Sequence, residues 1–231
     1  MRTLGLIGGM TWHSTVDYYR LINEGVHKRL GGSHSAEILM LSVDFDPVED
    51  MQTKGDWTAM GRLMAGAART LETAGAEALV ICANTMHRLA DDIAAAVKIP
   101  LIHIADAAAA EVRRQGLRTI GLLGTRYTME LDFYRGRLEA RHGLKVLVPD
   151  EPGRTTVHDI IYNELGHGLV RQEARQAYVG IINDLVRRGA EGVILGCTEI
   201  PMLVRPQDSP VPVFDTTAIH AAAAVDFALS S

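Results

Sequence analysis

The stretch "GAEALVICANT" occupies Gly75–Thr85, and "GAEGVILGCTE" occupies Gly189–Glu199. Both open with Gly-Ala-Glu and continue into an apolar run, which is typical of a buried parallel strand bounded by turns. They lie 114 residues apart (189 minus 75), so we interpret one as a duplicate of the other. At this offset Cys197 corresponds to Ala83, so one copy carries a thiol where the other carries a methyl group.

The similarity extends to both sides of these stretches. "LGLIGG" at Leu4–Gly9 resembles "IGLLGT" at Ile120–Thr125, and "IPLIHIADAAAAEV" at Ile99–Val112 resembles "VPVFDTTAIHAAAAV" at Val211–Val225. Segments that recur in the same order predict two similar domains that face each other.

Short apolar runs alternate with longer amphipathic stretches along the chain. The predicted strands are Leu4–Ile7, Ala36–Ser42, Ala78–Ile81, Leu101–Ile104, Thr119–Leu123, Lys145–Val148, Gly192–Leu195 and Val211–Phe214. The predicted helices include Ser14–Leu30, with Ser14 as a possible N-cap, and Thr58–Ala74, Glu130–His142 and Gln172–Arg188. Apolar strands that alternate with helices indicate parallel sheets covered on both faces.

The predicted fold class is therefore α/β, with two pseudo-symmetric three-layer domains built on parallel sheets. We expect the first domain to comprise residues 1–105 and 215–231, where a C-terminal helix returns to it. The second domain is expected at residues 106–214.

Composition excludes several classes of partner. The net charge is −5 and the arginines are scattered, so no basic patch indicates nucleic acid or an anionic membrane. No apolar run approaches the ~20 residues that a membrane span needs, and the N-terminus does not resemble a signal peptide. Two cysteines without an export signal favour free thiols in a reducing cytoplasm. Neither the cysteines nor the nine histidines show metal-ligand spacing, so no metal site is expected.

Polar clusters follow four of the predicted strands. They are "GGMT" at Gly8–Thr11, "CANTMH" at Cys82–His87, "GTRYT" at Gly124–Thr128 and "GCTE" at Gly196–Glu199. Ligands of open α/β sheets bind beyond the carboxyl ends of the strands, so we expect these clusters to line one interdomain cleft that holds the active site. Glycines and helix N-termini suit a small anionic ligand.

Four motifs in this order resemble the aspartate/glutamate racemase superfamily, nearest to its aspartate racemase and broad-specificity amino-acid racemase branch. They are "LIGGMTWHSTVDYYRLIN", "CANTMH", "LLGTRYTMELDFYRGRL" and "GCTEI", and the resemblance covers nearly the whole chain. Glutamate racemases look more distant, because they carry Asp-Ser-Gly where this chain has Gly8-Gly9-Met10.

The resemblance implies a racemase that uses no pyridoxal phosphate or other cofactor. In that family two cysteines from opposite domains flank the α-carbon of the substrate, one as thiolate base and the other as thiol acid. Aspartate or glutamate is the leading substrate, and a homodimer is expected. Since the α-hydrogen is far less acidic than a thiol, donors to the substrate carboxylate must stabilise the charge that develops.

Carried onto this sequence, Cys197 matches the second catalytic cysteine. The first stands immediately before the Asn-Thr pair, where this chain has Ala83, and Cys82 comes one residue early. Side chains alternate faces along a strand, so Cys82 is expected to point away from the cleft when residue 83 points into it. A loop at the strand end is the alternative, because it could rotate Cys82 back.

Three explanations of the vacant position remain open. The chain is an inactivated or substrate-trapping racemase, a natural one-cysteine decarboxylase or isomerase of the same superfamily, or an amino-acid-binding protein without turnover. In each case the sequence as written is expected to be slow or inactive as a racemase, because alanine carries no exchangeable proton.

The polar residues of the clusters are expected to bind the substrate. The candidate contacts are Gly9, Met10, Gln52, Asn84, Thr85, His87, Thr125, Thr198 and Glu199. Helix capping is the alternative for the short polar residues, a structural role for His87, and a solvated loop for Gln52. Aspartate racemases also present a basic pair to the side-chain carboxylate, for which Arg126 is the remaining candidate.

Overall fold

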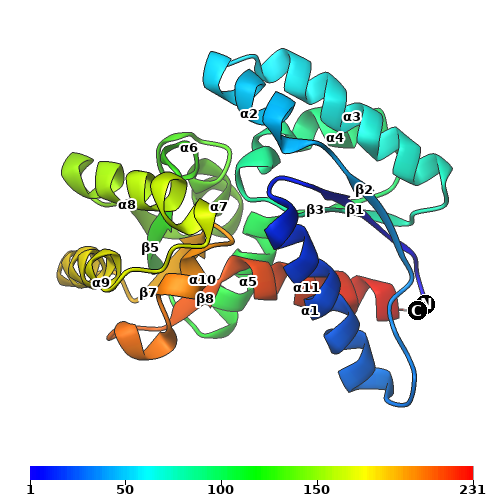
Figure 1. The fold of residues 1–231 in the computed structure, drawn as a ribbon. Helices are drawn as coiled ribbons and strands as arrows, with labels where there is room; N and C mark the ends of the chain where they lie inside the picture. Colours follow the sequence, from blue (N-terminus) through cyan, green and yellow to red (C-terminus); the bar gives the residue numbers. More distant parts are fainter. Residues whose placement is uncertain (231) are drawn as a thin grey trace. The chain divides into compact units, whose positions relative to one another are not determined.

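The computed structural model describes residues 1–230, which divide into two compact units (Figure 1). The first comprises residues 1–104 together with the C-terminal segment from His220, and the second is Ala105–Ile219. Each is an α/β domain around a four-stranded parallel sheet, which confirms the predicted fold class.

The sheet of the first unit has the strand order β2-β1-β3-β4. Its strands are β1 (Leu4–Gly8), β2 (Ile38–Ser42), β3 (Ala78–Ile81) and β4 (Leu101–Ile102). Every neighbouring pair is parallel, with Leu4 opposite both Ile38 and Ala78. β1 and β3 are entirely buried, which explains their continuous apolar sequences.

Helices cover both faces of this sheet (Figure 1). They are α1 (Trp12–Leu30), α2 (Phe45–Lys54), α3 (Trp57–Thr73), the 3₁₀ helix η1 (Thr85–Leu89), α4 (Ala90–Ala96) and the C-terminal part of α11 (Thr216–Leu229). Leu4, Leu6 and Val80 pack with α1 and α11 on one face. Ile7 and Ile81 pack with α2, α3 and α4 on the other. The alternation of side chains along each strand thus builds a three-layer domain.

The second unit repeats the plan with the strand order β6-β5-β7-β8. Its strands are β5 (Thr119–Gly124), β6 (Lys145–Leu147), β7 (Gly192–Gly196) and β8 (Val213–Asp215). Its helices are α5 (Ile104–Arg114), α6 (Arg126–Glu130), α7 (Arg135–His142), α8 (Glu151–Asn163), α9 (Gln172–Arg187) and α10 (Ile200–Leu203), with the 3₁₀ helices η2 (Leu165–His167) and η3 (Pro206–Asp208). Leu123, Val193 and Leu195 form a core with α8, α9 and α10.

Several predicted boundaries are wrong. The strands expected from Ala36 and from Val211 begin only at Ile38 and Val213. The strand expected at Leu101–Ile104 ends at Ile102, because Ile104 already begins α5. Ser14 is not an N-cap, since α1 begins at Trp12 with Thr11 as its cap residue. The Ser14 hydroxyl instead donates to the carbonyl oxygens of Thr11 (2.9 Å) and Cys82 (3.1 Å).

Two further expectations fail within helices. The helix expected at Glu130–His142 is interrupted, because Leu131 adopts an extended conformation that ends α6 before α7 begins at Arg135. Gln52 does not lie in a loop but in α2, where its side chain is buried. Asp44 caps the start of α2, and Gly55 ends it in the left-handed conformation.

Candidate functional site

Predicted site residues gather at the carboxyl edge of the first sheet. Since its strands are parallel, their carboxyl ends share one edge. Gly9 and Met10 follow β1 there, and Ala83, Asn84 and Thr85 follow β3. The first unit therefore brings two of the predicted clusters to the same place.

The turn after β1 requires glycine at position 9. Gly9 has a φ of 96°, and an added Cβ would overlap the carbonyl oxygen of Val43. Its N–H donates to the Thr15 hydroxyl at 2.8 Å, which ties the turn to the first helical turn of α1. Met10 is buried beside it, so backbone and not an exposed side chain forms this part of the edge.

Cys82 and Ala83 point into different cores, as strand alternation predicts. Cys82 is fully buried among Tyr18, Ile22 and their neighbours on the α1 and α11 face. Ala83 packs with Ile81 on the opposite face of the sheet. Burial raises the pKa of the Cys82 thiol well above its usual range, so this thiol stays protonated. The displaced cysteine is therefore a core residue.

Side chains hold the two carbonyl groups that follow β3. The Cys82 carbonyl accepts the Ser14 hydroxyl, and the Ala83 carbonyl lies 2.8 Å from Nδ1 of His87. Nε2 of His87 accepts the Ile104 N–H at 3.2 Å. Both ring nitrogens of this buried histidine thus have backbone partners, which favours the structural role for His87 over direct substrate contact.

The other candidates of the first unit differ in exposure. Asn84 precedes η1 and is buried, whereas Thr85 opens η1 and is half-buried. Gln52 is only 7% exposed, so it is no solvated residue. All three keep polar side chains near an otherwise apolar core.

The second unit presents a matching edge. Thr125 follows β5, and Cys197, Thr198 and Glu199 follow β7, whose strand is parallel to β5. Thr125 acts as the N-cap of α6, because its hydroxyl accepts the N–H of Thr128. The capping alternative therefore holds for Thr125, and it leaves room for a second role.

Cys197 forms a hydrogen-bonded pair with Glu199. Its Sγ donates to a carboxylate oxygen of Glu199 at 2.9 Å, and the Thr198 hydroxyl donates to the same oxygen at 2.7 Å. Burial first, and then the Glu199 charge and hydrogen bond, raise the pKa of Cys197 well above its usual range, although the N–H groups of Thr198 and Glu199 oppose this effect. The resting group is thus a neutral thiol that faces a proton acceptor.

A comparison with protein families settles the class of the chain. The family model described as Asp/Glu/Hydantoin racemase matches residues 7–224. The chain belongs to this racemase family. The resemblance of its four motifs is thereby confirmed.

Relatives of this racemase-family chain cover all or nearly all of its length. A solved structure from Yersinia pestis, provisionally described as an Asp/Glu racemase, is 55% identical over 100% of both chains with a TM-score of 0.95. An aspartate racemase homologue from Pyrococcus horikoshii OT3 is 35% identical over 100% of both chains with a TM-score of 0.87. The broad-specificity amino-acid racemase RacX of Bacillus subtilis (strain 168) is 22% identical over 228 residues, 96% of each protein.

The expected basic partner for a substrate side chain has other contacts. The Arg126 guanidinium donates to Glu151 at 3.3 Å and to the Thr155 hydroxyl at 2.9 Å. This arginine of the racemase-family chain is therefore committed to α8. A cation that would select dicarboxylates is not identified among the predicted residues.

Sequence reasoning missed a polar pair that follows β8. The Thr216 hydroxyl donates to the Leu195 carbonyl at 2.8 Å, so it supports the end of β7 before Cys197. The Thr217 hydroxyl oxygen is buried without a hydrogen-bond partner in the described part of the chain. The signal was available, because "DTT" follows an apolar strand just as the other clusters do.

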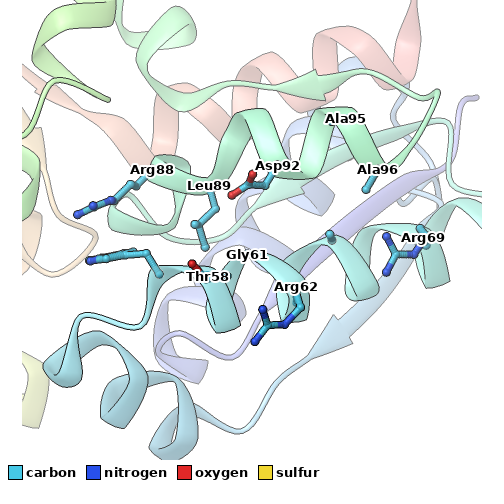
Figure 2. A pocket seen from close by; sticks show the side chains of 11 residues that line it. Thr58, Gly61, Arg62, Arg69, Arg88, Leu89, Asp92, Ala95 and Ala96 are labelled. Carbon is cyan, nitrogen blue, oxygen red and sulfur yellow. The ribbon is translucent and has the colours of Figure 1, made fainter.

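A cavity of about 510 Å³ lies between α3, η1 and α4 (Figure 2). Arg62 and Arg69 of α3, Arg88 of η1 and Asp92 of α4 contribute to its lining. It contains none of the predicted site residues.

Within residues 1–230 there is no group of three His, Cys, Asp or Glu side chains that could hold a metal ion. Over the same residues, no helix combines the length and apolar character needed to cross a membrane.

Proposed function

We propose that the chain is a cofactor-independent racemase-family enzyme that performs cysteine acid/base chemistry at the α-carbon of an amino acid. Aspartate or glutamate is the leading substrate. The observation that carries the proposal is the pair of Cys197 and Glu199 at the end of β7, where a buried thiol donates to a carboxylate. Such a pair can take up and return a proton at one position.

The chemistry assigned to this pair is a single proton transfer in either direction. As a base, Cys197 first passes its proton to Glu199, and the thiolate then takes the α-proton of the substrate. As an acid, the thiol gives its proton to the α-carbon, and Glu199 returns a proton to sulfur. Because the pKa of Cys197 is raised, the acid form predominates at rest and formation of the thiolate is the costly step.

The second acid/base position is assigned to Ala83 and is vacant. Racemisation requires a proton removed from one face of the α-carbon and delivered to the other. A methyl group cannot do either, so the chain as it stands is expected to invert its substrate slowly or not at all. Cys197 alone can still remove a proton from one face of the α-carbon and return it to the same face.

The substrate contacts are proposed from the polar residues at the two strand edges. Backbone at Gly9 and Met10, and side chains of Gln52, Asn84, Thr85, Thr125, Thr198 and Glu199, would bind the α-carboxylate and ammonium groups. Small neutral donors at helix N-termini suit a carboxylate, and Glu199 suits the ammonium group.

A second candidate function is favoured by the same vacancy. A decarboxylase or a one-sided isomerase needs a proton delivered from one face only, which Cys197 alone can provide. A binding protein without turnover is the third possibility, but it gives no reason for the contact between Cys197 and Glu199.

Restoring the vacant group tests the proposal. Ala83→Cys and Ala83→Thr are each expected to increase inversion of aspartate or glutamate by at least about a hundredfold, which is the low end for general acid/base catalysis. Optical rotation or chiral chromatography measures the rate. The Cys82→Ala substitution in the same background is the control, and it is expected to leave the gain intact because Cys82 lies in the core. Loss of the gain on Cys82→Ala would contradict the assignment of position 83.

Ligand selectivity is tested separately. A ligand that binds only the native state raises its melting temperature by mass action. Both enantiomers of aspartate, glutamate and several neutral amino acids are compared with malonate by thermal shift. Stabilisation by an acidic amino acid supports the proposal, whereas a response to malonate alone favours the decarboxylase.

A further inference from the structure

His87 has a defined protonation state. Its Nδ1 lies 2.8 Å from the Ala83 carbonyl oxygen, and its Nε2 lies 3.2 Å from the Ile104 nitrogen. A backbone carbonyl only accepts hydrogen bonds and a backbone N–H only donates them. Nδ1 therefore carries the proton and Nε2 does not. The ring is neutral and fixed in one tautomer.

His220 of α11 is fixed in the opposite tautomer. Its Nε2 lies 2.7 Å from the Ile102 carbonyl and so must donate, which leaves Nδ1 to accept the Tyr18 hydroxyl at 2.7 Å. The rings of His87 and His220 are 5.4 Å apart, and the His103 ring is 4.6 Å from His87. Protonation of His87 would direct an N–H at the Ile104 N–H, which can only donate, and burial lowers the pKa of both His87 and His220.

This network lies where the chain passes between its two units. The chain leaves the first unit after Ile104 and returns to it at His220. His87 accepts from Ile104, and His220 donates to Ile102 two residues earlier. The backbone at Ile104 is therefore linked through the His87 ring to the carbonyl that follows β3. The His220 ring, at the second crossing, lies beside the His87 ring.

The turn after β3 depends on such side-chain contacts. The Cys82 N–H donates to the Ile7 carbonyl at 2.9 Å, which continues the pairing of β3 with β1. Beyond it, Ser14 holds the Cys82 carbonyl and His87 holds the Ala83 carbonyl. Strand alternation directs residue 83 to its face of the sheet, and groups outside the sheet hold the carbonyl groups of the turn.

We propose that His87 is a positioning residue of the racemase-family site, which fixes the turn from residue 83 to residue 85 through its hydrogen bond to the Ala83 carbonyl. This inference rests on the proposed function, because the proposed function assigns residue 83 to the acid/base position. His87 touches no substrate in this scheme. It acts by holding the backbone that carries the reacting group and the neighbouring Asn84 and Thr85.

Two substitutions separate this role from simple filling of the core. His87→Asn keeps a donor at the position of Nδ1 and loses the acceptor for Ile104. His87→Gln keeps an acceptor at the position of Nε2 and loses the donor to Ala83. Each variant retains one of two buried hydrogen bonds, but Asn is one methylene smaller than Gln and leaves the larger cavity. The melting temperature is therefore expected to fall at least as far in His87→Asn as in His87→Gln.

The functional test uses Ala83→Cys as the parent. His87→Gln is expected to lower kcat for inversion about tenfold to a hundredfold, the effect of misplacing a reacting group by about 1 Å, while KM changes less. His87→Asn is expected to restore kcat to within about threefold of the parent, because the Ala83 contact survives. Equal kcat values in the two variants would overturn the inference.

A measurement on the otherwise unsubstituted chain separates failure of this inference from failure of the proposed function. In NMR spectra at neutral pH, the amide signals of residues 83–85 are expected to shift in His87→Gln and to stay near their original positions in His87→Asn. If the parent Ala83→Cys gains no inversion, the proposed function is contradicted and the NMR result decides the positioning role alone. Amide signals that move equally in both variants, or a ring protonated at Nε2 of His87, would overturn it.

Discussion

The chemistry proposed for this racemase-family chain depends on one thiol and the carboxylate that accepts its proton. Cys197 is buried and Glu199 lies within hydrogen-bond distance, so both desolvation and charge raise the pKa of the thiol. A thiol with a raised pKa reacts slowly with electrophiles, because little of it is thiolate at equilibrium. The rate at which Cys197 reacts with an electrophile therefore measures how far Glu199 raises the pKa of the thiol.

Glu199→Gln is expected to make Cys197 more reactive. The substitution removes a negative charge, so the pKa of Cys197 falls and the fraction of thiolate at pH 8 rises, by about tenfold for a change of one pKa unit. The rate of alkylation by iodoacetamide, followed by mass spectrometry of the Cys197 peptide, measures this. Glu173→Gln, on the exposed surface of α9, is the control. An unchanged or slower rate in Glu199→Gln would contradict the electrostatic account.

At the scale of residues, the sequence predicts side-chain direction better than side-chain contacts. Strand alternation places Cys82 and Ala83 on opposite faces because the period of a strand is two. The hydrogen bond of Cys197 to Glu199, two residues away, depends on the turn after β7 and on side-chain torsion angles. Nothing in the letters "GCTE" specifies those angles.

Among the elements, the turn between β1 and α1 is the most constrained part of the first strand edge. Gly9 combines a positive φ with close approach to the backbone at Val43. Any side chain there would move the start of α1 or the end of β2. Gly55 also has a positive φ, 72°, but nothing lies within 4 Å of its added Cβ. A side chain at Gly55 would meet only the strain of a positive φ, whereas a side chain at Gly9 would also overlap the backbone of Val43.

Gly9→Ala is expected to destabilise the fold much more than Gly55→Ala. The left-handed conformation costs roughly 1–2 kcal/mol at either position, and overlap at Gly9 adds about 1–3 kcal/mol. Urea unfolding followed by circular dichroism gives both free energies of unfolding. Equal losses in the two variants would mean that the close approach at Gly9 carries no energetic weight.

Most elements could be predicted because their apolar periodicity is strong. β1, β3 and β7 are continuous buried runs, and α1 and α9 show amphipathic patterns. The helix α2 was missed because "FDPVEDMQTK" contains proline near its start and few apolar residues. The break between α6 and α7 follows from the extended backbone at Leu131. No glycine or proline stands at that position to indicate the end of a helix.

The whole molecule is two copies of one plan, and the repeat in the sequence predicted this. Both sheets share the strand order second, first, third, fourth when the strands are numbered within each unit. Chain order and strand periodicity determine that plan. The buried histidines of the first unit could not be foreseen, because Tyr18, Ile102 and His220 meet only when the fold is complete.

The histidine network predicts loss of stability in acid. Burial lowers the pKa of His220 from 6.5 to about 4, so its contribution is fully present above pH 6.5 and is lost as the pH falls toward 4. At 1.36 kcal/mol per pH unit this loss is at most roughly 3 kcal/mol. Urea unfolding at several pH values measures it. His220→Gln keeps a donor for Ile102 but does not titrate, so its stability is expected to depend less on pH than that of His34→Gln, an exposed control.

Exchange of the α-hydrogen in heavy water tests the central claim most directly. Each enantiomer of aspartate and glutamate is incubated with the unsubstituted chain and with Cys197→Ala, and deuterium uptake and configuration are followed together. The account predicts uptake by one enantiomer with retention of configuration, and loss of that uptake in Cys197→Ala, because a single acid/base group serves one face. Rapid inversion by the unsubstituted chain would contradict the vacancy at Ala83, and absence of uptake for every substrate would contradict catalysis by Cys197.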